Sequence, residues 1–143
     1  MIAFRWRLAL AGLAIAAGCR GGFEAEFNQP PSESYTVASC QVSFDDARRS
    51  VPCATVAVEF FRAAGVRPYV GRFFSAADYG SGAQLVIVLS HATWAERFGK
   101  SPTIIGRAVV VDGRPGTVVG VAAPEFRFPG ETQLWLTRRD GGQ

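Results

Sequence analysis

Few residues in this sequence have the types and spacing that enzymes use, and each of them has a simpler structural explanation. His91 is the only histidine, and a zinc site or a serine-type triad would need metal-binding or catalytic partners around it. Its neighbour Ser90 is expected to cap the helix that follows. The sequence has neither a Gly-x-Ser-x-Gly nor a His-Glu-x-x-His pattern. Because no nucleophile is matched with a base, we predict that the protein is not an enzyme.

Two further patterns also favour structure over chemistry. Gly99-Lys100-Ser101 matches the end of a phosphate-binding loop, but Trp94 stands where that loop needs its first glycine, and a helix is expected to precede it where a strand is required. Lys100 is better explained as a cation at a helix C-terminus. Asp45 and Asp46 are adjacent carboxylates at a hairpin tip, where such residues are usually solvated. We therefore predict no nucleotide, metal ion or other cofactor.

The cysteines suggest a cross-link. Cys40 and Cys53 are equally far from a turn centred between Asp46 and Ala47, so an even-length hairpin would place them opposite each other. Directly opposed residues have Cα atoms about 4.5 to 5.5 Å apart, a distance that a disulfide spans. The alternative is two small buried side chains that happen to align. A disulfide would leave Cys19 as the odd thiol.

The N-terminal residues have the pattern of an export signal. Arg5 and Arg7 precede an uncharged run of 11 residues, 8–18, which is too short to cross a bilayer. The small residues before Cys19 resemble the lipobox of bacterial lipoproteins, in which the cysteine receives lipid. A plain secretory signal and an uncleaved anchor are the alternatives. We expect a signal or anchor over 1–18, a tether over 19–34, and a domain on the periplasmic side of a membrane.

Composition predicts one folded domain. The chain has 143 residues, of which 48% are hydrophobic and 19% are charged, which excludes intrinsic disorder. The formal net charge is +3, and it falls to +1 without Arg5 and Arg7 (3 − 2). A domain this close to neutral has no electrostatic footprint for nucleic acid.

Residue patterns predict an α+β domain over 35–143, with a mixed, mainly antiparallel sheet and two helices on one face. A short apolar run at 84–89 is typical of a strand that is buried on both faces. Asp112 and Gly113 favour a hairpin turn, and Ser75 with Asp78 is a helix-start signal. The expected strands are 35–44, 51–58, 84–89, 107–111, 117–121 and 133–136, and the expected helices are 59–64 and 91–98.

An ordered set of these segments resembles a known family, the MacB-like periplasmic core domain in permease subunits of ABC transporters (the FtsX-related group). The segments are 58–68, 71–74, 86–90 with Trp94, 97–99, 105–107, 118–121, 126–129 and 134–135. The resemblance covers the C-terminal part of the family domain only. It implies a non-catalytic extracytoplasmic domain that passes ATP-driven motion from the membrane to a substrate or partner, with permease or ATPase subunits as partners.

The family's later membrane helices and most of its N-terminal half are expected to have no counterpart in this sequence. We therefore expect either a truncated permease fragment or a free, membrane-tethered version of the core domain, which cannot transport a substrate alone. The alternative function is an envelope lipoprotein that binds a small ligand or partner and has no role in transport.

Overall fold

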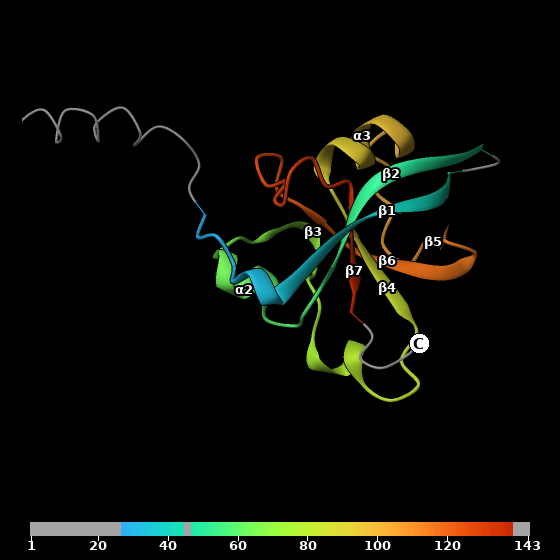
Figure 1. The fold of residues 1–143 in the computed structure, drawn as a ribbon. Coiled ribbons are helices and arrows are strands. Elements are labelled where there is room, and N and C mark those ends of the chain that lie inside the picture. The colour runs from blue at the N-terminus through green and yellow to red at the C-terminus, as the bar shows by residue number, and fades with distance from the viewer. Residues whose placement is uncertain (1–26, 45–46, 139–143) are drawn as a thin grey trace, which may run out of the picture.

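The computed structural model describes residues 27–44 and 47–138 (Figure 1). Cys19, Asp45 and Asp46 lie outside these residues, so the predictions that concern them stay predictions. The strands are β1 (Tyr35–Phe44), β2 (Ala47–Val56), β3 (Pro68–Gly71), β4 (Leu85–Leu89), β5 (Ala108–Val111), β6 (Arg114–Ala122) and β7 (Leu134–Thr137). The helices are η1 (Ser32–Ser34), α2 (Phe60–Ala64), η2 (Ala76–Tyr79) and α3 (His91–Phe98).

All the strands belong to one sheet, in the order β3-β6-β4-β7-β2-β1-β5. Because β5 pairs with β6 as well as with β1, the pairings close into a ring, and β3 lies on its outside edge. The β2–β7 and β4–β6 pairings are parallel, and the other pairings are antiparallel. The predicted mixed, mainly antiparallel sheet is therefore confirmed.

The central strand β4 is buried on both faces, as its apolar run predicts. Successive side chains of a strand point to opposite faces, and β4 accordingly divides between two cores. Leu85, Ile87 and Leu89 belong to the core inside the ring, with Cys40, Cys53 and Trp94 among its other members. Val86 and Val88 belong to an aromatic-rich core on the outside, which includes Phe60, Phe61, Phe126 and Trp135.

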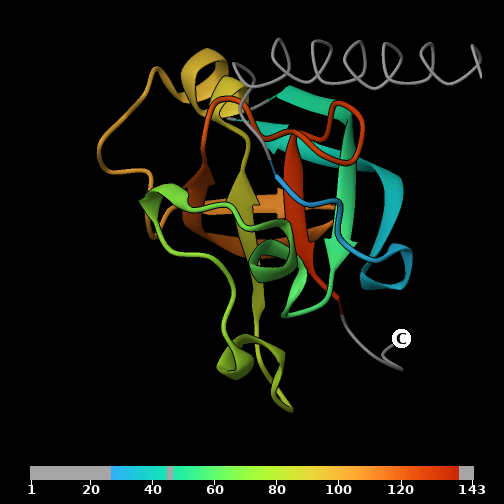
Figure 2. The same ribbon diagram turned by 90° about the vertical axis from the view of Figure 1, so that its left-hand side faces the viewer.

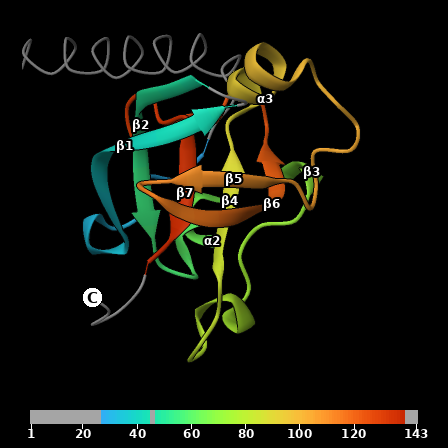
Figure 3. The same cartoon turned by 90° about the vertical axis from the view of Figure 1, so that its right-hand side faces the viewer.

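The two helices do not share one face, and this part of the prediction is wrong. α2 contributes Phe60, Phe61 and Ala64 to the outer core, whereas Trp94 of α3 lies in the inner core. Figure 3 shows the β5–β6 hairpin in front of β4 and β7 and α2 behind them, with α3 at the end where β4 finishes. On an open sheet, a helix packs against one of the two faces. In a closed ring, a helix can also pack at the open end, where α3 lies.

Some boundaries differ from the prediction. β2 begins at Ala47, because a two-residue loop suffices to pair Phe44 with Ala47. β6 begins at Arg114, because Asp112 (φ 50°) and Gly113 (φ 81°) alone make the predicted turn. β3 was not predicted, and it pairs with β6 along the outside of the ring.

The described part of the predicted tether, residues 27–34, packs against the domain. The Phe27 ring contacts Phe126 edge-on, with ring centroids 5.0 Å apart. The Asn28 N–H donates to the carbonyl oxygen of Ala64 (2.9 Å), and Pro30 is buried. In Figure 2 this segment runs in front of the sheet from the last grey residues to η1. The folded unit therefore begins at least eight residues before Tyr35.

Candidate functional site

Ser90 and His91 have structural roles in this fold. The Ser90 hydroxyl accepts the N–H of Thr93 (3.1 Å) and donates to its hydroxyl (2.9 Å), which confirms that Ser90 caps α3. The His91 ring packs edge-on against Tyr69 and Trp94, with centroids 4.8 and 5.5 Å away. The Ser90 hydroxyl is therefore hydrogen-bonded at the helix N-terminus, and the His91 imidazole packs against aromatic side chains.

The residues that resemble a phosphate-binding loop form a helix C-terminus. Gly99 adopts the left-handed conformation that ends α3, and the N–H of Lys100 donates to the Trp94 carbonyl oxygen (3.1 Å). These backbone groups close the helix and do not point outward to cradle an anion. Within 27–44 and 47–138, no cluster of three His, Cys, Asp or Glu side chains is placed to hold a metal ion.

Cys40 and Cys53 form a disulfide across the β1–β2 hairpin, with Cα atoms 5.9 Å apart. The sequence spacing predicted that the two cysteines are directly opposed, and this detail is wrong. Cys40 faces Val51, and Cys53 faces Ala38, because the turn is centred one residue earlier than expected. The resulting offset of two positions keeps both side chains on the inner face, so the bridge is diagonal.

The twist of the hairpin explains why a diagonal pair can meet. On each face of a right-twisted pair of strands, the twist brings one of the two diagonal pairs of side chains closer together. The closer pair is shifted in one direction along the partner strand on one face and in the other direction on the opposite face. On the inner face, Cys40 bonds to Cys53, two residues after its register partner Val51. On the outer face, the Ser39 hydroxyl lies 2.7 Å from that of Ser50, which is two residues before the register partner Pro52. This twist cannot be predicted from the spacing of the cysteines in the sequence alone.

The Arg72–Asp78 ion pair holds the loop after β3. Arg72 donates to both carboxylate oxygens of Asp78 (2.8 and 3.2 Å). The Ser75 N–H donates to Asp78 Oδ2 (2.8 Å), which confirms the helix-start signal at this position. Burial opposes ionisation of Asp78, but the hydrogen bonds from Arg72 and Ser75 outweigh it and hold the pKa of this carboxyl below its usual range. The sequence signal included Ser75 and Asp78 but missed Arg72.

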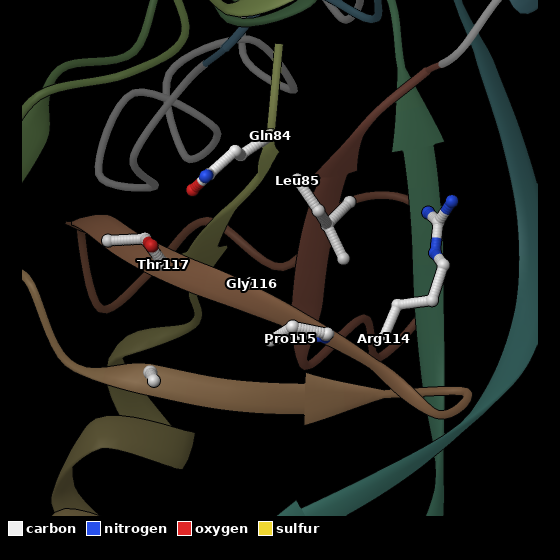
Figure 4. Close-up of a pocket in the computed structure, with 7 residues that line it drawn as sticks. Gln84, Leu85, Arg114, Pro115, Gly116 and Thr117 are labelled. Atoms are coloured by element: carbon white, nitrogen blue, oxygen red, sulfur yellow. The ribbon is translucent and has the colours of Figure 1, made fainter. Parts of the chain in front are cut away.

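A surface hollow of about 400 Å³ lies between the start of β4 and the β5–β6 hairpin (Figure 4). It is lined by Gln84, Leu85, Ala108, Arg114, Pro115, Gly116 and Thr117. The lining offers an amide, a guanidinium and a hydroxyl, which can hydrogen-bond a small polar molecule. It has no carboxylate, thiol or imidazole, so it lacks an acid–base pair of the usual kind.

Comparison with known proteins identifies the fold. The family model of the MacB-like periplasmic core domain matches residues 21–140. The extracellular domain of the ABC-type transporter YknZ from Gram-positive bacteria superposes with a TM-score of 0.59 at 19% identity, over 73% of this chain and 52% of that one. The periplasmic region of MacB from Actinobacillus actinomycetemcomitans gives 0.55 at 17% identity, over 77% and 58%. No curated protein matches this chain in sequence.

The described residues thus form a ring of strands with an apolar interior. The chain belongs to the MacB-like periplasmic core domain family. The segments that carry the resemblance in the sequence begin at residue 58. The family model matches from residue 21, so the match also includes the packed segment 27–34. The chain spans about half the length of the two solved domains. Among the described residues, no helix is long and apolar enough to cross a membrane.

Proposed function

We propose that this protein is a non-catalytic extracytoplasmic domain that works at the membrane surface with an ABC transporter permease or its ATPase, where it transmits motion or contacts a partner. The family match over residues 21–140 carries the proposal. Two of the solved structures with a similar fold are the extracellular domain of one transporter and the periplasmic region of another.

The packing supports a mechanical role. The inside of the ring is filled by apolar side chains, and the outer core joins α2, the central strands and the 126–128 corner into one body. Interiors packed in this way have low compressibility and transmit displacement. A displacement at one end of the ring is therefore passed on rather than absorbed.

Photo-crosslinking in the host tests the partner. A photoreactive amino acid replaces Tyr69 or Ile105, apolar residues that are 56% and 42% exposed. Arg62, an exposed charged residue of α2, is the control position. We expect the first two positions to capture an ABC permease or ATPase subunit, identified by mass spectrometry, more strongly than the control. Capture of neither class, or equal capture from all three positions, contradicts the proposal.

We also propose that lipid on Cys19 anchors the domain on the periplasmic side. The basis is the run of small residues before this cysteine and the apolar segment that precedes them. The full chain and its Cys19→Ser variant are compared by incorporation of labelled palmitate in a bacterial host. Label on the wild type alone supports lipidation. Equal label on both proteins excludes it, and an unprocessed, unlabelled wild type favours an uncleaved anchor.

A further inference from the structure

The first half of β1 is an uncovered edge of the sheet. β2 pairs with β1 along its whole length, whereas β5 pairs with it only at Val42 and Ser43. The next residue, Gln41, is covered by the β5–β6 turn: its N–H donates to Asp112 Oδ1 (2.8 Å), and its carbonyl oxygen accepts the Asp112 N–H (2.7 Å). In the part of the chain that the structure describes, no strand pairs with residues 36–39 on this side.

The backbone groups along this edge point outward. Gln41 directs its N–H and carbonyl oxygen away from β2, and this direction alternates residue by residue along a strand in an antiparallel pair. Ser39 and Val37 therefore direct theirs the same way. Both residues are exposed, and Val37 is 60% exposed. Among residues 27–44 and 47–138, no strand pairs with the outward donors and acceptors of these two residues, which lie in line with the covered Gln41.

The other free edge, that of β3, carries features that prevent pairing. Pro68 has no N–H, the register of β3 shifts between Pro68 and Val70, and Arg67 and Arg72 flank the strand. Proline, irregular register and charge are the usual protections of an edge strand. The ten residues of β1 contain no charged residue and no proline. This difference indicates that the β1 edge is a pairing surface.

We propose that this edge pairs antiparallel with the same edge of a second copy of the chain, on a two-fold axis through Ala38. Val37 of each copy then exchanges hydrogen bonds with Ser39 of the other. Ala38 meets its counterpart as a non-hydrogen-bonded pair, where opposed Cα atoms are only about 4.5 Å apart, and its small side chain suits that position. The proposal stands whether or not the domain works in transport.

The lack of charge on the edge favours a second copy over an unrelated strand. A two-fold axis brings each residue near its own counterpart, so a charged edge would repel itself. The β1 edge avoids this repulsion along its whole length. The contact is short, and a cross-link that traps weakly associated dimers is therefore the appropriate test.

The test uses the full chain in bacterial membranes, with Ala38→Cys and, as a matched control, Thr36→Cys. Both positions are exposed and lie on the same face of β1. The two position-38 thiols would meet on the axis. The two position-36 thiols would lie four residues apart along the strands, about 13 Å, which is too far for a disulfide. After mild oxidation, we expect at least fivefold more reducible dimer from Ala38→Cys. Because Cys53 faces position 38 and its disulfide can exchange with a new thiol there, only dimer that peptide mapping assigns to a 38–38 link is counted.

A second variant combines Ala38→Cys with Val37→Lys, which adds charge to the edge. We expect the dimer to fall at least fivefold while the thermal melting of the purified chain stays unchanged. Equal cross-linking of the position-36 and position-38 variants, or a dimer unaffected by Val37→Lys, overturns the proposal. A link from position 38 to Cys19 at monomer mass also overturns it, because the chain's own N-terminal segment would then lie on the edge.

Discussion

The Cys40–Cys53 bridge links β1 and β2 on the inner face of the sheet, where both side chains are almost completely buried. It lies close to the point where the β1 edge becomes uncovered. The bridge therefore holds together a hairpin whose β1 side pairs with β5 at only two positions. We propose that it forms in the oxidising periplasm.

Replacing both cysteines should lower stability. The bridge joins residues 13 positions apart, and the chain-entropy model gives about 3 kcal/mol for a loop of this size. For Cys40→Ala/Cys53→Ala we expect a loss of that order in the free energy of unfolding, measured in urea. Reduced wild-type protein is the control and should show a similar loss. Alkylation of both cysteines in unreduced periplasmic protein would show that the bridge does not form.

Asp78 should make stability depend on acid. Its pKa is lowered in the folded state, so its contribution is full above the unfolded value of about 3.9 and is lost as pH falls through the lower folded value. We expect Asp78→Asn to destabilise the protein by up to about 1 kcal/mol at pH 7, the range of a partly exposed ion pair, and by less below about pH 4. Urea unfolding at both pH values tests this. A difference that stays constant between them would contradict it.

The elements that sequence predicts well are those with an internal signal. α3 carries its own stops, with Ser90 before it and Gly99 after it, and the apolar run of β4 identifies it as a central strand. The missed elements depend on neighbours. The first residues of β2, Ala47 to Ser50, are exposed and carry no strand signal, and they become a strand because β1 pairs with them. β3 likewise exists because β6 lies beside it.

The crossing of β3 and β6 should be sensitive to a single methyl group. A Cβ on Gly120 would overlap the carbonyl oxygen of Arg72, where the chain leaves β3 beside β6. We expect Gly120→Ala to cost at least 2 kcal/mol, because backbone on both sides has to move. Gly80→Ala is the control, since its Cβ would meet only ordinary contacts and the residue has an unstrained φ of −71°. Equal melting temperatures for the two variants would contradict this.

The candidate site was predictable in part. Sequence identified the two cysteines and the capping residue Ser90, because local spacing encodes both. It did not identify the hollow between β4 and the β5–β6 hairpin, whose residues come from two segments 23 to 33 positions apart in the sequence. Nor did it identify the uncovered half of β1, because the length over which β5 pairs with β1 is a property of the whole ring.

The folded unit as a whole should depend on the segment before β1. Phe27 packs against Phe126 and Phe128, and Pro30 is buried. We expect a fragment of residues 35–143 to melt at least 5 °C below one of residues 27–143, since about 1 kcal/mol moves the melting temperature of a small domain by 4–8 °C. Phe27→Ala in the longer fragment should give part of this loss. Identical melting curves would show that the segment is an independent tether.

The position of β7 has a consequence for how the chain folds. β7 is the last strand in the sequence, but it lies between β2 and β4 at the centre of the sheet. The β1–β2 hairpin can form early from local contacts, whereas β2 and β4 have no shared neighbour until residues 134–137 are available. Such non-local pairing slows folding and leaves apolar strands exposed for longer. The centre of the sheet is therefore the last part of the domain that can be completed.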